Sequence, residues 1–231
     1  MQITSHDALV VVDMQIDFCP GGALPVPDGD AVVHVIQRIA PRFDHVLLTQ
    51  DWHPPEHCSF ASTYPGLEPF DVLPWEPEQR VWPDHCVQGT RGAEFHPSLH
   101  LPHAELILRK GFRKNIDSYS AFFENDRTTA TGLTAYCRER GFERLFFAGL
   151  AYDFCVGYSA LDARSTGFSS VVVRNACRAI DVDGSVEAVE TEFARQNVLL
   201  VEAAGQELIP IGQDRAPARQ GRDEGFARRT A

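Results

Sequence analysis

The sequence predicts a single-domain α/β protein with three layers, in which helices cover both faces of a mostly parallel six-stranded sheet. Short apolar runs alternate along the chain with amphipathic segments of helical period, which is the pattern of parallel strands connected by helices. The chain has 231 residues and 44% hydrophobic content, enough for one sizeable core. We find no internal repeat and no linker that would divide it into two domains.

Six apolar runs are expected to form the strands of the sheet. The first, residues 7–13, is almost continuously apolar, as in a strand that is buried on both faces. The later strands are expected, in chain order, at residues 45–49, 105–108, 144–150, 170–173 and 197–201.

Helical segments separate most of these runs. Gly141 stops the second helix, and Asp153 is the expected N-cap of the third. The four helices are expected at residues 30–39, 131–140, 154–165 and 186–196.

Two segments fall outside this alternation. Residues 52–103 lack clear periodicity and are rich in proline, histidine and aromatic residues. A loop of this length inside a compact domain usually carries function. Residues 213–231 are polar and rich in arginine, so we expect the domain to span residues 1–212 and the remainder to form a mobile tail.

Composition restricts the partners and the compartment. The chain carries 32 acidic and 21 basic residues, a formal net charge of -11, which disfavours nucleic acid or an acidic membrane surface as a partner. No window approaches the roughly 20 apolar residues that a membrane span needs. The short polar N-terminus shows no signal-peptide pattern, so the six cysteines are expected to be reduced thiols of a cytoplasmic protein.

Reactive side chains follow four of the expected strands in turn. The first strand ends in Asp13, the second is followed by Asp51 and His53, the third by Lys110, and the fourth leads into Cys155. Ligands of an open parallel sheet bind outside the carboxyl ends of its strands. The sequence therefore predicts an acid, a metal-type cluster, a base and a thiol at one edge of the sheet.

Each of these groups also has a purely structural interpretation. Cys155 lies in the opening turn of a helix, where free N–H groups favour a thiolate and could hold an oxyanion, but a lone cysteine is more often a small buried residue. Asp13 is either a functional carboxylate or a turn former, and Lys110 either a base or a solvated surface residue. We interpret the other cysteines as structural: Cys19, Cys58, Cys86, Cys137 and Cys177.

Asp51, His53 and His85 are candidate ligands of a metal ion. A carboxylate with imidazoles suits zinc, iron or manganese, although an Asp-x-His pair often occurs by chance. His57 is a candidate fourth ligand. Cys86 is not expected to bind the same ion as His85, because adjacent residues seldom point at one ion.

The motifs at these positions, taken together, resemble the nicotinamidase branch of the isochorismatase-like hydrolase superfamily. The resemblance runs from about residue 7 to residue 203 and leaves out the segment after residue 212. It rests on ALVVVDMQIDF (8–18), TQDWHP (49–54), WPDHCV (82–87), KG (110–111), DSYSAF (117–122) and GLAYDFCV (149–156), all in the family's order.

The resemblance implies a role for each matched position. Asp13, Lys110 and Cys155 would form a catalytic triad, and the N–H groups of Ala151 and Cys155 an oxyanion hole next to a cis Leu150–Ala151 peptide. Asp51, His53 and His85 would bind one divalent metal, with zinc favoured over iron or manganese, and His57 matches a position that ligates the metal in some members. The ring pocket would be lined by Phe18, Trp82, Tyr119 and Leu150.

The implied activity is hydrolysis of nicotinamide or pyrazinamide through a thioester, a step of pyridine nucleotide salvage for NAD biosynthesis. Lys114 is a rival for the triad lysine, but Lys110 directly follows the strand and precedes a glycine. Three alternatives remain: an amidase of the superfamily that acts on carbamoyl or ureido groups without a metal, an isochorismatase that needs no cysteine, and a non-catalytic binding protein. Whether the chain forms a homo-oligomer stays open.

Overall fold

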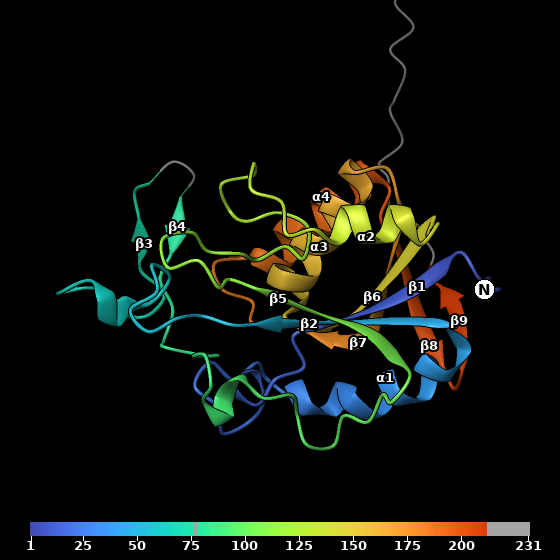
Figure 1. Ribbon diagram of the computed structural model, residues 1–231, viewed down its shortest axis with the longest axis horizontal. Helices are drawn as coiled ribbons and strands as arrows, with labels where there is room; N and C mark the ends of the chain where they lie inside the picture. The colour runs from blue at the N-terminus through green and yellow to red at the C-terminus, as the bar shows by residue number, and fades with distance from the viewer. Residues whose placement is uncertain (76–77, 212–231) are drawn as a thin grey trace, which may run out of the picture.

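A seven-stranded sheet forms the centre of the computed structural model, which describes residues 1–75 and 78–211 (Figure 1). The predicted α/β class is confirmed. The tail predicted at residues 213–231 lies outside the described residues. In spatial order the strands are β5 (Ala104–Lys110), β2 (His45–Asp51), β1 (Asp7–Val12), β6 (Arg144–Leu150), β7 (Ser169–Arg178), β8 (Leu199–Ala204) and β9 (Glu207–Pro210).

The six expected strands are all present and mutually parallel, but the expected number of strands was one too low. The seventh strand, β9, pairs antiparallel with β8 across a turn at Gly205, whose φ is +64°. β9 has four residues, of which Leu208 alone is buried, and it ends in Pro210. So short and exposed an edge strand needs no apolar run, and no periodic pattern therefore marks it in the sequence.

Helices cover both faces of the sheet, as predicted. In Figure 1, α1 (Val33–Ile39) lies below the sheet, whereas α2 (Leu133–Glu139), α3 (Gly157–Ser165) and α4 (Ser185–Gln196) lie above it. Alternate residues of β1 enter the two cores: Leu9 packs in the core that contains α1, and Val10 in the core that contains the other three helices. This alternation is why the first strand is apolar on both faces.

The helix ends differ from the predicted ones in two places. The first helix begins as a 3-10 turn, Gly29–Val32, before α1. The third begins as a π-helical turn, Tyr152–Val156, before α3, and Asp153 does not cap it. Instead, the Asp153 carboxylate accepts hydrogen bonds from the N–H groups of Ile180 and Asp181 and from the Ser185 hydroxyl. These partners of Asp153 lie in the β7–α4 connection and at the start of α4, far from Asp153 in sequence. Local sequence spacing could therefore not predict that Asp153 would bond them rather than cap the helix.

Segment 52–103 first extends past the carboxyl end of β2, at the left of Figure 1, and then returns below α1 to the start of β5. It contains the two-stranded hairpin β3 (Val72–Leu73) and β4 (Gln79–Arg80) and little other regular structure. Among the described residues, no helix is long and apolar enough to cross a membrane. The remaining 3-10 turns are Ile16–Phe18, Ala40–Arg42, Ala61–Thr63 and Arg91–Ala93.

Gly149 allows β1 and β6 to approach closely at their carboxyl ends. Its φ is +120°, and a Cβ atom at this position would lie 2.1 Å from the carbonyl oxygen of Val12. The same approach brings Asp13, directly after β1, close to the turn that carries Cys155. A side chain at position 149 would therefore displace backbone rather than a flexible side chain.

Gly149→Ala should destabilise the protein more than Gly167→Ala does. Gly167 has a φ of +99°, but a Cβ atom there would meet nothing within 4 Å, so its substitution isolates the cost of the backbone conformation, about 1–3 kcal/mol. Steric overlap should add about 1–3 kcal/mol at Gly149. Urea denaturation of both variants measures the difference, and equal losses would show that the close approach is not rigid.

Candidate active site

Asp13, Lys110 and Cys155 converge at the carboxyl ends of β1, β5 and β6. Lys110 is the last residue of β5, Asp13 follows β1, and Cys155 lies in the π-helical turn after β6. The Lys110 Nζ atom is 2.9 Å from Asp13 Oδ2 and 3.4 Å from Cys155 Sγ. The three side chains are buried, so they interact where water screens little.

Lys110 is held on several sides by oxygen atoms. Besides the contact with Asp13, its ammonium donates to Asp51 Oδ1 at 2.7 Å and to the Ser118 carbonyl at 2.8 Å. Burial disfavours the charged form, but the carboxylates of Asp13 and Asp51 outweigh it and raise the pKa of Lys110 well above its usual value. The rival Lys114 instead lies 2.7 Å from Glu56 at the surface. The structure therefore brings Lys110, and not Lys114, to Asp13.

The Asp13 carboxylate has one oxygen occupied by the protein and one left for a further donor. The Thr49 hydroxyl donates to Oδ1 at 2.6 Å. Oδ2 contacts the Lys110 ammonium but accepts no hydrogen bond of ordinary geometry from the described residues. Burial raises the pKa of Asp13, against the opposing effect of Lys110, which makes this carboxylate a better proton acceptor than an exposed one.

The surroundings of the Cys155 thiol raise its pKa and so favour the protonated form. Burial is the main cause that raises its pKa well above the usual value, and Asp13 and Asp51 act in the same direction, against Lys110. The Sγ atom and carboxylate oxygens of both aspartates lie within 4.8 Å of one another. A thiol that keeps its proton next to a receptive carboxylate can be deprotonated as it attacks.

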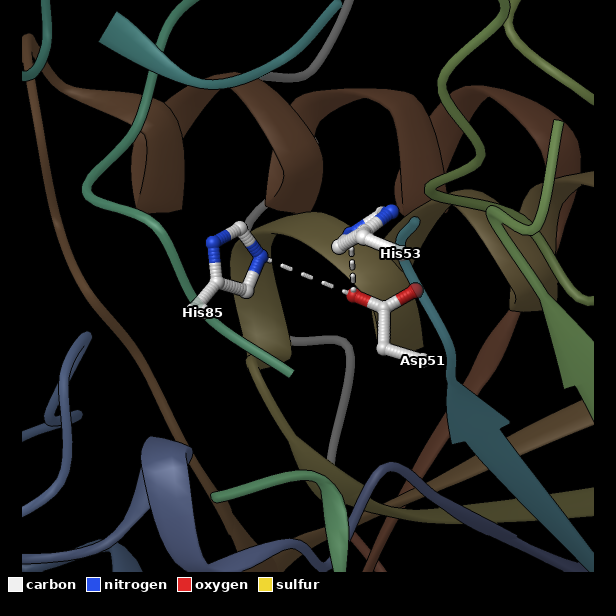
Figure 2. Close-up of side chains that lie close together, drawn as sticks. All are labelled: Asp51, His53 and His85. Atoms are coloured by element: carbon white, nitrogen blue, oxygen red, sulfur yellow. Dashed lines mark ion pairs between the residues drawn. The ribbon is translucent and has the colours of Figure 1, made fainter. Parts of the chain in front are cut away.

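Asp51, His53 and His85 meet in a second cluster beside this one (Figure 2). Asp51 Oδ2 lies 3.3 Å from His53 Nε2 and 3.8 Å from His85 Nε2. The Nδ1 atoms face backbone carbonyls, that of Gly111 at 2.8 Å for His53 and that of Pro83 at 2.7 Å for His85. These carbonyls assign the ring protons to Nδ1.

Both Nε2 lone pairs therefore point toward the carboxylate. Three buried acceptors that converge in this way could hold a cation, and nitrogen and oxygen ligands of this kind suit zinc. Burial favours neutral imidazole, yet the Asp51 carboxylate raises the pKa of His53, so the cluster attracts positive charge. The donor set fits one divalent metal.

His57 lies beside His53 and is outside the group of Asp51, His53 and His85, but with His53 and Asp117 it forms another group that could hold a metal ion. Its ring stacks on that of His53 with centroids 4.2 Å apart. The N–H of Ser59 donates to Nδ1 at 3.3 Å, which leaves the proton on Nε2, 3.0 Å from the Arg113 carbonyl. Burial and the neighbouring His53 lower the pKa of His57 to about 4. Both nitrogens are thus used by the protein, and His57 supports His53 sterically.

A narrow pocket with a cavity volume of about 20 Å³, called the ring pocket below, borders both clusters. Phe18, Trp82 and Tyr119 line it, as the resemblance implied, and the Trp82 Nε1–H donates to the Tyr119 hydroxyl at 3.1 Å. Asp51, His85, Ala151 and Cys155 also face it. Further lining residues that sequence reasoning missed are Leu24, Asp117, Phe154 and Ile180.

Leu150 does not line the ring pocket, contrary to expectation. Its side chain is fully buried and packs against Gly29, where a Cβ would lie 3.1 Å from Leu150 Cδ1. The Leu150–Ala151 peptide is cis, as the resemblance implied. Ala151 and Cys155 both face the ring pocket, so their backbones border the space that a substrate carbonyl would occupy.

Two polar residues next to Asp13 in sequence hold the metal-type cluster in place. The Gln15 side chain clamps the backbone of Asp51, donating to its carbonyl and accepting from its N–H, each at 2.8 Å. Asp17 accepts the N–H of Cys86 at 2.7 Å and so fixes the loop that carries His85. In the sequence, Gln15 and Asp17 are recognisable as polar residues shortly after a buried strand. Their roles could not be predicted, because their partners are distant in sequence.

A parallel α/β sheet with a buried acid, lysine and thiol at its strand ends can carry out nucleophilic hydrolysis. The isochorismatase domain model matches residues 7–203, and the chain belongs to this family. A nicotinamidase of Acinetobacter baylyi is 49% identical over 86% of this chain and 93% of its own length.

Solved structures agree with the sequence comparison. An Acinetobacter baumanii nicotinamidase/pyrazinamidase is 48% identical, with a TM-score of 0.85 over 86% of this chain and 97% of its own. A Pyrococcus horikoshii pyrazinamidase, solved in complex with zinc, is 34% identical, with a TM-score of 0.71 over 86% and 99%. The family match at residues 7–203 includes every residue of the two clusters.

Metal stoichiometry should distinguish His85 from His57. The wild-type protein, dialysed against zinc and then buffer, should retain one equivalent. His85→Gln removes a convergent lone pair and should abolish retention, whereas His57→Gln should keep one equivalent, at an affinity lowered about 10- to 100-fold at most. Elemental analysis with circular dichroism as the folding control measures this. Equal loss in both variants would make His57 a ligand.

Proposed function

We propose that the chain is a metal-dependent cysteine amidohydrolase of the nicotinamidase type, which converts nicotinamide, and also pyrazinamide, to the acid and ammonia. The observation that carries the proposal is the Lys110 ammonium, bound to Asp13 and Asp51 and 3.4 Å from Cys155, which lines an aromatic pocket. The names of the relatives support the same substrates. In this role the protein would serve pyridine nucleotide salvage in the cytoplasm.

The first half of the reaction forms a thioester. Asp13 Oδ2 takes the proton of the Cys155 thiol as the sulfur attacks the carboxamide carbon. Lys110 stays charged throughout and keeps the Asp13 carboxylate in position. The N–H groups of Ala151 and Cys155 would hold the oxyanion, and each such donor typically stabilises the transition state by about 3–4 kcal/mol. Protonated Asp13 then gives its proton to the leaving nitrogen, and ammonia departs.

The second half hydrolyses the thioester. Asp13, again unprotonated, accepts a proton from a water molecule as its oxygen attacks the acyl carbon. The C–S bond breaks, the thiol is restored with the proton from Asp13, and the acid leaves. One water is consumed for each amide bond cleaved. The same carboxylate thus acts as base and acid in both halves, which suits a raised pKa.

Asp51, His53 and His85 would hold one divalent metal, with zinc favoured. When bound, the ion supplies a Lewis acid for the ring nitrogen of the substrate. This cluster also separates the proposal from its main alternative. An amidase for carbamoyl or ureido groups would need the three catalytic residues but not two imidazoles turned toward a buried carboxylate beside them.

Substitution of each lysine tests the assignment of the triad. Lys110→Met should lower kcat/KM for nicotinamide about a thousandfold or more, because the Asp13 carboxylate loses its buried counter-charge. Lys114→Met should leave it near wild type, because that side chain is half exposed and contacts Glu56 alone among the ion pairs of the described residues. Cys155→Ala should be inactive yet folded. The reverse ranking of the lysines would refute the assignment.

A comparison of amides with and without a ring nitrogen tests the substrate assignment. Nicotinamide and pyrazinamide carry a ring nitrogen, and benzamide has nearly the same shape without one. Misplacing a bound carbonyl by about 1 Å can cost about a hundredfold in rate, so benzamide should be slower by about that factor. Chelation or His53→Ala should lower kcat/KM for nicotinamide toward the value for benzamide. Steady-state kinetics with ammonia detection measures kcat/KM for each. If benzamide equalled nicotinamide in zinc-loaded protein, the substrate assignment would be wrong.

A further inference from the structure

A second cavity, called the outer cavity here, adjoins the ring pocket and has no part in the proposed reaction. Its volume is about 240 Å³, against about 20 Å³ for the ring pocket. Hairpin residues such as Arg80, the β7–α4 turn with Asp183, and Tyr158 of α3 surround it. Tyr119 and Phe154 line both cavities.

Tyr119 and Phe154, called the shared wall here, lie on the exposed side of the ring pocket, which is otherwise buried. Tyr119, Phe154 and Ile180 are partly exposed, whereas Cys155, Trp82 and the other lining residues are buried. Two of these three partly exposed residues therefore face the outer cavity. The wall consists of edge-to-face rings, with the centroids of Tyr119 and Phe154 5.5 Å apart, rather than of backbone. Aromatic side chains of this kind can turn to let a group lie between the two cavities.

The outer cavity has a definite chemical character. Tyr158 is 39% exposed, and its ring meets that of Tyr119 with centroids 5.2 Å apart, so the inner side of the cavity is aromatic. Among the residues that the structure describes, its charged lining residues are Glu78, Arg80 and Asp183, a net charge of -1. Arg80 is already committed, since its guanidinium donates to Asp183 at 2.8 Å and to the Phe70 carbonyl at 2.6 Å.

We propose that the outer cavity is a second substrate subsite, which receives an aromatic or cationic substituent carried by the pyridine ring. The inference rests on the proposed nicotinamide hydrolysis and extends it to larger carboxamides. The aromatic wall would stack on such a group, and the net negative lining would favour a cation over an anion.

Ring geometry selects the position of the substituent. In nicotinamide the carboxamide is on C3, and C5 is the ring carbon bonded neither to C3 nor to the ring nitrogen. With C3 at Cys155, a C5 substituent points away from the reacting atoms. C2 lies between C3 and the nitrogen, so a group there would be forced toward the catalytic residues. The pair of C5 and C2 isomers is therefore a matched probe of equal size and polarity.

The first experiment compares 5-phenylnicotinamide, 2-phenylnicotinamide and nicotinamide. The 5-phenyl compound should retain kcat/KM within about tenfold of nicotinamide, and the 2-phenyl isomer should lose about a hundredfold or more. Dissociation constants measured on the Cys155→Ala variant should rank the isomers in the same order. If nicotinamide is not hydrolysed, the proposed function fails. If nicotinamide is hydrolysed but both isomers are equally poor, only the subsite is refuted.

Variants outside the catalytic machinery locate the subsite. Tyr158→Ala should raise KM for 5-phenylnicotinamide about three- to tenfold, through loss of an aromatic contact, and leave nicotinamide unchanged. Tyr158→Phe keeps the ring and should behave as wild type with both substrates. An equal change for both substrates in the alanine variant would mean a general structural effect and would overturn the assignment.

Changing the charge of the substituent, and that of the cavity lining, gives an independent test. Wild-type protein should prefer 5-(aminomethyl)nicotinamide to 5-carboxynicotinamide. Asp183→Asn removes the counter-charge of the Arg80 guanidinium and should raise kcat/KM for the carboxy compound severalfold, about the effect of one partly exposed charge. Asp181→Asn is the matched control, because Asp181 is also exposed with a positive φ, 56° against 53°, but does not line the outer cavity. Equal responses of the two variants would place the substituent elsewhere.

Discussion

The buried ammonium of Lys110 is the interaction on which the arrangement of the site depends. It contacts two carboxylates, Asp13 at 2.9 Å and Asp51 at 2.7 Å, and all three groups are buried. Removing one charge from such a group leaves the others uncompensated, at a typical cost of about 3–5 kcal/mol. The ends of β5, β1 and β2 are therefore joined by charge as well as by backbone hydrogen bonds.

Asp51 connects the catalytic residues to the metal-type cluster through its two oxygen atoms. Oδ1 accepts from Lys110, and Oδ2 faces the Nε2 atoms of His53 and His85. One carboxylate thus links the cluster that contains Lys110 and Asp13 to the cluster that contains His53 and His85. The backbone of Asp51 is fixed in turn by the Gln15 amide, two residues after Asp13. The two clusters cannot shift independently.

Sequence reasoning correctly placed together those residues of the site whose positions follow from the order of the strands along the chain. Asp13, Lys110 and Cys155 each follow an apolar run, and parallel strands bring such positions to one edge. It failed where a distant partner decides the outcome. Asp153 bonds the β7–α4 connection instead of capping a helix, and Leu150 packs on Gly29 instead of facing the ring pocket. Pocket walls from irregular chain, such as Leu24 and Ile180, carry no periodic signal at all.

The dipeptide Lys110–Gly111 shows why both clusters need the same short stretch of backbone. The Lys110 side chain reaches Asp13, while its carbonyl accepts the N–H of Trp52 at 2.9 Å. The next carbonyl, of Gly111, orients His53 through Nδ1. Gly111 has a φ of +65°, and a Cβ there would lie 2.5 Å from His53 Cε1. A residue other than glycine would push away the imidazole that the carbonyl orients, so the triad lysine and the metal-type cluster constrain one another through adjacent residues.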